Sequence, residues 1–198
     1  MAEAIKDLNP DNMPRSNGIT YQELLDTDTH EVPPVLRLQS PKYLGDADVS
    51  IERYISKDWH NREVERLWKK VWQMACREED IPVAGDHIRY DIAGSSFLVV
   101  RTDSGEIKSY PNACLHRGRM LKEFDGRSSE IRCAFHGFCW SLDGDLTDVP
   151  ARWDFPHIDS KEFSLPEIPT ATWGGFVFIN PDQECDPFED FIKDLAQQ

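Results

Sequence analysis

Two short motifs in the middle of the chain combine cysteine with histidine. Cys114 and His116 are separated by one residue and Cys133 and His136 by two, with sixteen residues between the pairs. Thiolate and imidazole are ligands that zinc and iron accept in proteins. Residues i and i+2 of an extended loop point the same way, so we expect Cys114 and His116 to face one centre. Cys133 and His136 can do the same across a tight turn closed by Gly137, which predicts a metal site on two paired loops.

Two kinds of metal centre fit two cysteines and two histidines. One is a tetrahedral zinc site, although the usual zinc spacing places the cysteines on one loop and the histidines on a following helix. The other is a Rieske [2Fe–2S] centre, in which one iron takes two cysteines and the other takes two histidines. Each loop carries one cysteine and one histidine, so both loops can contribute to both irons, and this distribution favours the Rieske centre. Because its oxidised form carries no net charge, it accepts an electron more readily than a four-cysteine cluster.

The segments around these motifs resemble a known family. The stretches CLHRG at 114–118 and CAFHGF at 133–138 are similar to the two cluster loops of the Rieske non-haem iron oxygenases, the ring-hydroxylating dioxygenase α subunits. WSLDG at 140–144 and WGGFVF at 173–178 resemble the strand after the second loop and the strand that closes the domain. The resemblance covers roughly residues 51–195.

The resemblance implies a role for each ligand and a set of partners. Cys114 and Cys133 would hold the inner iron, and His116 and His136 the outer one. A ferredoxin or flavin reductase would donate the electrons, with NAD(P)H as the ultimate reductant. The full-length protein would be a homo-oligomer, a trimer in which the cluster feeds the iron of a neighbouring subunit.

The same family uses a second metal, a mononuclear Fe(II) held by two histidines and a carboxylate. Its motif resembles Asp/Glu-x2-His-x4-His and follows the closing strand. Asp154 and His157 have the first spacing, but Glu162 stands where the second histidine is needed. We therefore expect the mononuclear iron in a downstream catalytic domain outside this chain, which leaves electron transfer as the role of these residues. A stand-alone Rieske ferredoxin, acting only as an electron carrier, is the alternative.

Short β-like runs punctuated by glycine surround both motifs. They are His87–Ile92, Phe97–Arg101, Glu106–Tyr110, Glu130–Phe135 and Phe138–Leu142. Trp173–Ile179 predicts a final buried strand. Many short strands at close spacing indicate a small antiparallel β domain. Together with the resemblance, they predict a mainly β fold with flanking helices, a Rieske-type domain carrying a two-loop [2Fe–2S] site.

Helices are predicted on both sides of the strands. Ser56 is a good N-cap, and an apolar stripe at helical spacing follows it, which predicts a helix whose two tryptophans pack in the core. The stripe consists of Val64, Leu67, Trp68, Val71 and Trp72. A second helix begins near Asp186-Pro187, where a capping residue precedes proline.

These patterns divide the chain into four parts. Residues 1–50 are polar and rich in proline, which predicts either an extended arm over a neighbouring surface or a disordered segment, with a short helical piece at 21–25. Residues 51–80 form a helical segment and residues 81–180 the Rieske domain. Residues 181–198 would begin a helix that leads into the absent catalytic domain.

Composition excludes several classes of function. The 198 residues carry 36 acidic and 22 basic side chains, a net charge of −14, which disfavours binding to nucleic acid or to an anionic membrane surface. No apolar run reaches the roughly 18–20 residues of a membrane span. Five cysteines without an export signal disfavour a disulfide framework. We expect a cytoplasmic protein in which Cys139 is a buried structural thiol, while Cys76 and Cys185 have no partner pattern.

Overall fold

The computed structural model describes residues 21–37 and 48–196, in two compact units, 1–49 and 50–198. In the first unit, α1 (Tyr21–Asp26) and the 3₁₀ turn η2 (Pro34–Arg37) are joined by an ion pair of 2.7 Å between Arg37 Nη1 and Asp26 Oδ1. The short helix expected at 21–25 is therefore present. The remainder of the predicted arm, residues 1–20 and 38–47, lies outside the described residues.

The second unit begins with three consecutive helical pieces, α2 (Glu52–Ile55), α3 (Lys57–Glu63) and the π-helical turn η3 (Val64–Trp68). Ser56 caps α3 as predicted, because its hydroxyl accepts a hydrogen bond of 3.3 Å from the backbone N–H of Trp59. The predicted core packing of the two tryptophans is wrong in part, since Trp68 and Trp72 are only partly buried. The π turn adds residues to one turn and so shifts the side chains out of the α-helical phase.

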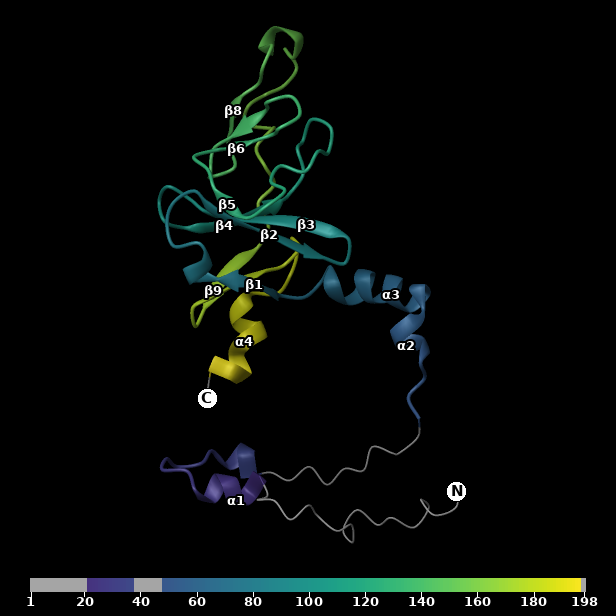
Figure 1. Ribbon diagram of the computed structural model, residues 1–198, viewed down its shortest axis with the longest axis vertical. Coiled ribbons are helices and arrows are strands. Elements are labelled where there is room, and N and C mark those ends of the chain that lie inside the picture. Colours follow the sequence, from purple (N-terminus) through teal and green to yellow (C-terminus); the bar gives the residue numbers. More distant parts are fainter. Residues whose placement is uncertain (1–20, 38–47, 197–198) are drawn as a thin grey trace. The chain divides into compact units, whose positions relative to one another are not determined.

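Three antiparallel sheets make up the rest of the unit, which confirms the predicted fold class (Figure 1). The first sheet has the order β1-β10-β9, with β1 at Gln73–Arg77, β9 at Thr170–Trp173 and β10 at Phe176–Ile179. The second has the order β4-β3-β2-β5, with β2 at Asp86–Ile92, β3 at Ser95–Arg101, β4 at Ile107–Pro111 and β5 at Gly126–Arg127. The third has the order β6-β7-β8, with β6 at Ile131–Arg132, β7 at Cys139–Trp140 and β8 at Leu146–Asp148. Short 3₁₀ turns, η4 (Glu78–Asp80) and η5 (Arg152–Asp154), lie between strands.

Three of the predicted strands differ from the structure, and one of them, Phe138–Leu142, is shortened to β7. The run Trp173–Ile179 is a hairpin, because Gly174 and Gly175 have φ of 59° and 83° and turn the chain between β9 and β10. Two consecutive residues with positive φ suit the tight turns that join antiparallel strands. The run Glu130–Phe135 is a strand only at β6, since the chain enters a turn after Cys133.

The hydrophobic core consists of two clusters, and the larger one includes both cysteines of the predicted site. Cys114 and Cys133 are 4% and 2% exposed there and pack in the same cluster as the fully buried Tyr110 and Trp140. The smaller cluster joins the first and second sheets through residues such as Val99 and Val177. The two cysteines of the site therefore belong to the larger core cluster.

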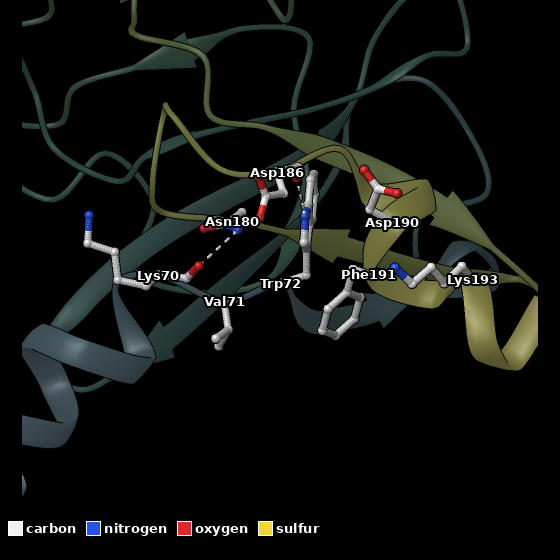
Figure 2. Close-up of a pocket in the computed structure, with 8 residues that line it drawn as sticks. All are labelled: Lys70, Val71, Trp72, Asn180, Asp186, Asp190, Phe191 and Lys193. Carbon is white, nitrogen blue, oxygen red and sulfur yellow. Dashed lines mark hydrogen bonds between the residues drawn. The ribbon is translucent and has the colours of Figure 1, made fainter.

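The C-terminal helix α4 (Phe188–Ala196) lies against β10, at the opposite end of this unit from β6 and β8 (Figure 1). Trp72 Nε1 donates a hydrogen bond of 3.1 Å to the carbonyl of Asp186, and its ring meets Phe188 edge-on at 5.1 Å. An open pocket of about 530 Å³ lies between Trp72 and this helix. Figure 2 shows the residues that line it. No helix among the described residues has the length and apolarity needed to cross a membrane.

Candidate metal centre

The two Cys/His motifs form loops with the same backbone hydrogen bonds. In the first, the N–H of Cys114 donates to the carbonyl of Arg119 (2.7 Å) and the N–H of Gly118 donates to that of Cys114 (2.8 Å). In the second, the N–H of Cys133 donates to Phe138 (2.8 Å) and that of Gly137 donates to Cys133 (3.0 Å). The two motifs differ in Cys–His spacing, but their loops close over the same number of residues.

Each loop depends on a glycine in the left-handed region. Gly118 has φ of 71° and Gly137 has φ of 78°, which other residues adopt only with strain. His116 and His136 both lie inside turns. The expectation of an extended first loop is therefore wrong, because a bond between residues four apart closes it as a turn.

The two cysteines meet in the interior between the loops. The thiol of Cys114 lies within hydrogen-bonding reach of the thiol of Cys133. Burial raises the pKa of the Cys114 thiol, and the neighbouring thiol raises it further. Two adjacent buried thiols ionise together only when a cation compensates their charge, which a metal centre provides.

The two histidines lie beside each other as well. The ring centroids of His116 and His136 are 4.8 Å apart at an interplanar angle of 63°. Nδ1 of His116 is buried and has no hydrogen-bond partner among the described residues. Burial, followed by the nearby His136 and Arg117, lowers the pKa of His116 and favours its neutral form. A neutral imidazole with an unpaired buried nitrogen is suited to ligate a metal.

Aromatic side chains hold the histidines in place. The ring of Phe138 stacks on His116 with centroids 4.7 Å apart and an interplanar angle of 15°. Phe155, from the proline-rich loop after β8, meets His116 edge-on at 5.6 Å. Phe135 lies 3.8 Å from His136 by ring centroids and is 60% exposed. One side of the histidine pair is thus packed against the core, and the other lies near the surface.

Asn112 closes the base of the first loop, a role that the sequence analysis missed. Its Oδ1 accepts hydrogen bonds from the backbone N–H groups of Leu121 (3.1 Å) and Lys122 (2.9 Å). Its Nδ2 donates to the carbonyl of Lys122 at 2.8 Å and to Ser96 Oγ at 3.1 Å. Asn112 is 3% exposed, so its side chain makes these hydrogen bonds to protein groups in place of hydrogen bonds to water. Its position two residues before Cys114 was the only sequence signal.

The remaining candidate residues lie apart from this group. Cys139 is fully buried, as expected of a structural thiol, and all five cysteines are free. His157 is exposed on a loop. Within residues 21–37 and 48–196, no three His, Cys, Asp or Glu side chains are placed to hold one metal ion. A Rieske centre requires only two protein ligands on each iron.

The residues present fit such a centre. Two buried thiols lie together, and two imidazoles lie together, one of them with an orphaned inward nitrogen. The cysteines are thus next to each other and the histidines are next to each other, as a cluster with one cysteine-bound iron and one histidine-bound iron requires. The pocket of Figure 2 lies elsewhere, since none of its lining residues belongs to either loop.

Comparison with known proteins defines the class. Residues 71–163 match the family model described as the Rieske [2Fe-2S] domain, which includes both loops. The large subunit of anthranilate 1,2-dioxygenase from Acinetobacter baylyi is 36% identical over 135 residues, covering 67% of this chain and 29% of that protein. The large oxygenase component of salicylate 5-hydroxylase from Ralstonia is 34% identical over 169 residues, covering 78% and 40%.

Solved structures give the same result. Naphthalene 1,2-dioxygenase from Rhodococcus, bound to indole, is 32% identical with a TM-score of 0.66, covering 70% of this chain and 32% of that one. A quaternary ammonium Rieske monooxygenase bound to γ-butyrobetaine is 25% identical with a TM-score of 0.68, covering 74% and 44%. The chain therefore carries a Rieske [2Fe-2S] domain and is homologous to the large subunits of Rieske oxygenases. It spans 29% to 40% of the length of the two curated relatives named above.

Proposed function

We propose that residues 51–195 act as the electron-transfer part of a Rieske oxygenase α subunit. Cys114 and Cys133 hold one iron of the [2Fe–2S] cluster, and His116 and His136 hold the other. When bound, such a cluster accepts and passes on single electrons. The observation that carries the proposal is the closure of both loops by the same hydrogen bonds, which brings the cysteines together and the histidines together.

The protein side chains supply position and insulation. Burial of the two cysteines keeps water away from the thiolates, and Phe138 and Phe155 fix the plane of the His116 ring. The exposed ring of Phe135 beside His136 marks the side from which electrons enter and leave. In this proposal, the far nitrogens of the two imidazoles form the electron port.

The rest of the proposal concerns the whole oxygenase. A ferredoxin or flavin reductase donates the electrons, and a mononuclear Fe(II) site in a downstream catalytic domain receives them. The relatives support this assignment, since they are oxygenase subunits, and the related quaternary ammonium Rieske monooxygenase gives insight into inter-subunit electron transfer. Transfer between subunits in that relative also supports a homo-oligomer here, which we propose to be a trimer. Five free thiols fit a reducing, cytoplasmic compartment.

Electron paramagnetic resonance of the dithionite-reduced protein, with iron, sulfide and zinc analysis, tests the proposal. We expect a rhombic Rieske signal with two irons and two sulfides per chain. One zinc per chain and no EPR signal would contradict the redox function and indicate a zinc-stabilised β module instead. Reduction of the cluster by a ferredoxin and its reductase, without oxygenation by any longer form of the protein, would support the stand-alone ferredoxin instead.

A further inference from the structure

Arg132 lies at the end of β6, directly before the ligand Cys133. In the third sheet, Arg132 is paired with Cys139 of β7, and Cys139 is paired with Asp148 of β8. Side chains alternate along a strand, so Ile131 and Cys133 point to the core while Arg132 points to the other face. The arginine and the aspartate therefore lie in one row across three strands, with the small Cys139 between them.

The guanidinium of Arg132 binds the second cluster loop as well as this row. Nη1 donates hydrogen bonds to the carbonyl of Gly137 at 2.9 Å and to Asp148 Oδ2 at 3.2 Å. Nε donates to Glu130 Oε1 at 2.7 Å. Gly137 is the residue whose own N–H closes the loop onto Cys133. Arg132 thus connects the two ends of the loop from outside, with the planar fork that suits several acceptors at once.

The ion pairs of Arg132 with Glu130 and Asp148 contribute little to the stability of the fold. The side chains of Arg132, Glu130 and Asp148 are 44%, 42% and 53% exposed, and pairs at such exposure contribute little to stability. Their position beside the cluster loop gives them another effect. Arg132 donates to both carboxylates at once, through Nε to Glu130 and through Nη1 to Asp148, so the charges are held in a fixed arrangement.

We propose that Arg132 is a positioning residue for the cluster, which holds the second loop through the Gly137 carbonyl and offsets the charges of Glu130 and Asp148 beside it. The inference rests on the proposed function, because it assumes a cluster held by Cys133 and His136. It concerns the reduction potential and the retention of iron rather than the identity of the ligands.

The charge arrangement predicts opposite effects for two substitutions. Arg132→Gln removes a positive charge and leaves two carboxylates uncompensated, so adding an electron to the cluster costs more and the reduction potential falls. Asp148→Asn removes a negative charge and leaves the bond from Arg132 to Gly137 in place, so the potential rises. Arg132→Lys keeps the positive charge but removes the planar guanidinium that binds several acceptors at once. Its reduction potential should therefore be close to that of the wild type, while iron should be lost faster.

The experiment is a redox titration of the full 198-residue chain and its variants, followed by EPR, together with the rate of iron loss to a chelator. We expect shifts of opposite sign for R132Q and D148N, and roughly tenfold faster iron loss in R132Q and R132K, as for other residues that support metal ligands. The matched control is Arg77→Gln. Arg77 ends β1 of the first sheet, and its Nη1 lies 2.9 Å from Oε1 of the exposed Glu79 in η4. This variant should change neither measurement.

Several results would overturn the inference. These are an unchanged or lowered potential in D148N, shifts of one sign in R132Q and D148N, or an equal shift in R77Q. If R132Q does not retain a cluster, D148N and R132K decide the question. A wild-type protein without a Rieske signal would instead reject the proposed function, so the two failures are distinct.

Discussion

The imidazole rings of His116 and His136 lie 4.8 Å apart, although the residues are twenty positions apart in the sequence. Each ring is carried by a turn that a glycine N–H closes onto a cysteine carbonyl. The second turn reaches its place because β6 and β7 pair on either side of it. The histidine pair is therefore a product of two similar loops on one β scaffold.

A pair of serine variants separates ligand from structural cysteine. Cys133→Ser should abolish the visible iron–sulfur absorption, because it removes one of the two thiolates. Cys139→Ser should leave the absorption, because Cys139 is fully buried in β7 and its hydrogen bond to the carbonyl of Trp140 can be kept by a hydroxyl. Absorption spectra with iron and sulfide analysis check both. Loss of colour in the second variant would contradict the ligand assignment.

Phe155 should matter more than its neighbour Trp153. Phe155 packs edge-on against His116 and Phe138, whereas Trp153 is 81% exposed. We expect Phe155→Ala to lower the free energy of unfolding by about 2 kcal/mol, less than for a fully buried ring, and to speed the loss of iron. Trp153→Ala should change the stability by less than about 0.5 kcal/mol. Urea unfolding followed by circular dichroism measures both, and equal effects would show that Phe155 does not support the site.

Alanine substitutions at two glycines with nearly equal φ test how closely Gly144 packs against Tyr110. Gly144 has φ of 89°, and a Cβ there would lie 2.8 Å from the ring of the buried Tyr110. Gly105 has φ of 88° and open space around it. Gly105→Ala should cost about 1 kcal/mol of backbone strain alone. Gly144→Ala should cost roughly 2–4 kcal/mol, because the overpacking adds to the strain. Thermal unfolding of the two variants gives the difference, and equal costs would contradict the close contact with Tyr110.

The lowered pKa of Asp86 predicts that the protein becomes less stable at acidic pH. The hydrogen bond from Arg127 and that from the backbone N–H of Val83 lower the pKa of Asp86 below its ordinary value of 3.8. A carboxyl with a lowered pKa stabilises the folded state above its unfolded pKa, and this stabilisation is lost as the pH falls through the folded value. The free energy of unfolding should therefore decline below about pH 4.

The Asp86→Asn variant isolates this contribution. Its stability, measured by urea unfolding between pH 3 and 6, should fall below that of the wild type at pH 6 and approach it in acid. Asp103→Asn, at an exposed turn, is the matched control and should follow the wild-type curve. A constant difference between D86N and the wild type over this range would reject the assignment.

Much of the fold could be predicted because it depends on local patterns. Alternating and apolar runs predicted β2, β3 and β4 within a residue or two, and Ser56 predicted the start of α3. Prediction failed where neighbouring strands decide the geometry. The run Trp173–Ile179 resembles one strand, but Gly174 and Gly175 turn it into a hairpin, and β10 then pairs with both β1 and β9.

The sequence by itself determined which side chains are available as the proposed donors, because two Cys/His pairs leave few metal centres open, and its motifs resemble those of one family. Only the tertiary structure decided how the donors are arranged. Cys–x–His and Cys–x2–His appear unequal in the sequence, yet both close as the same turn. The supporting residues Asn112 and Arg132 became apparent only in three dimensions, because their partners lie across a loop or across strands and leave no periodic signal.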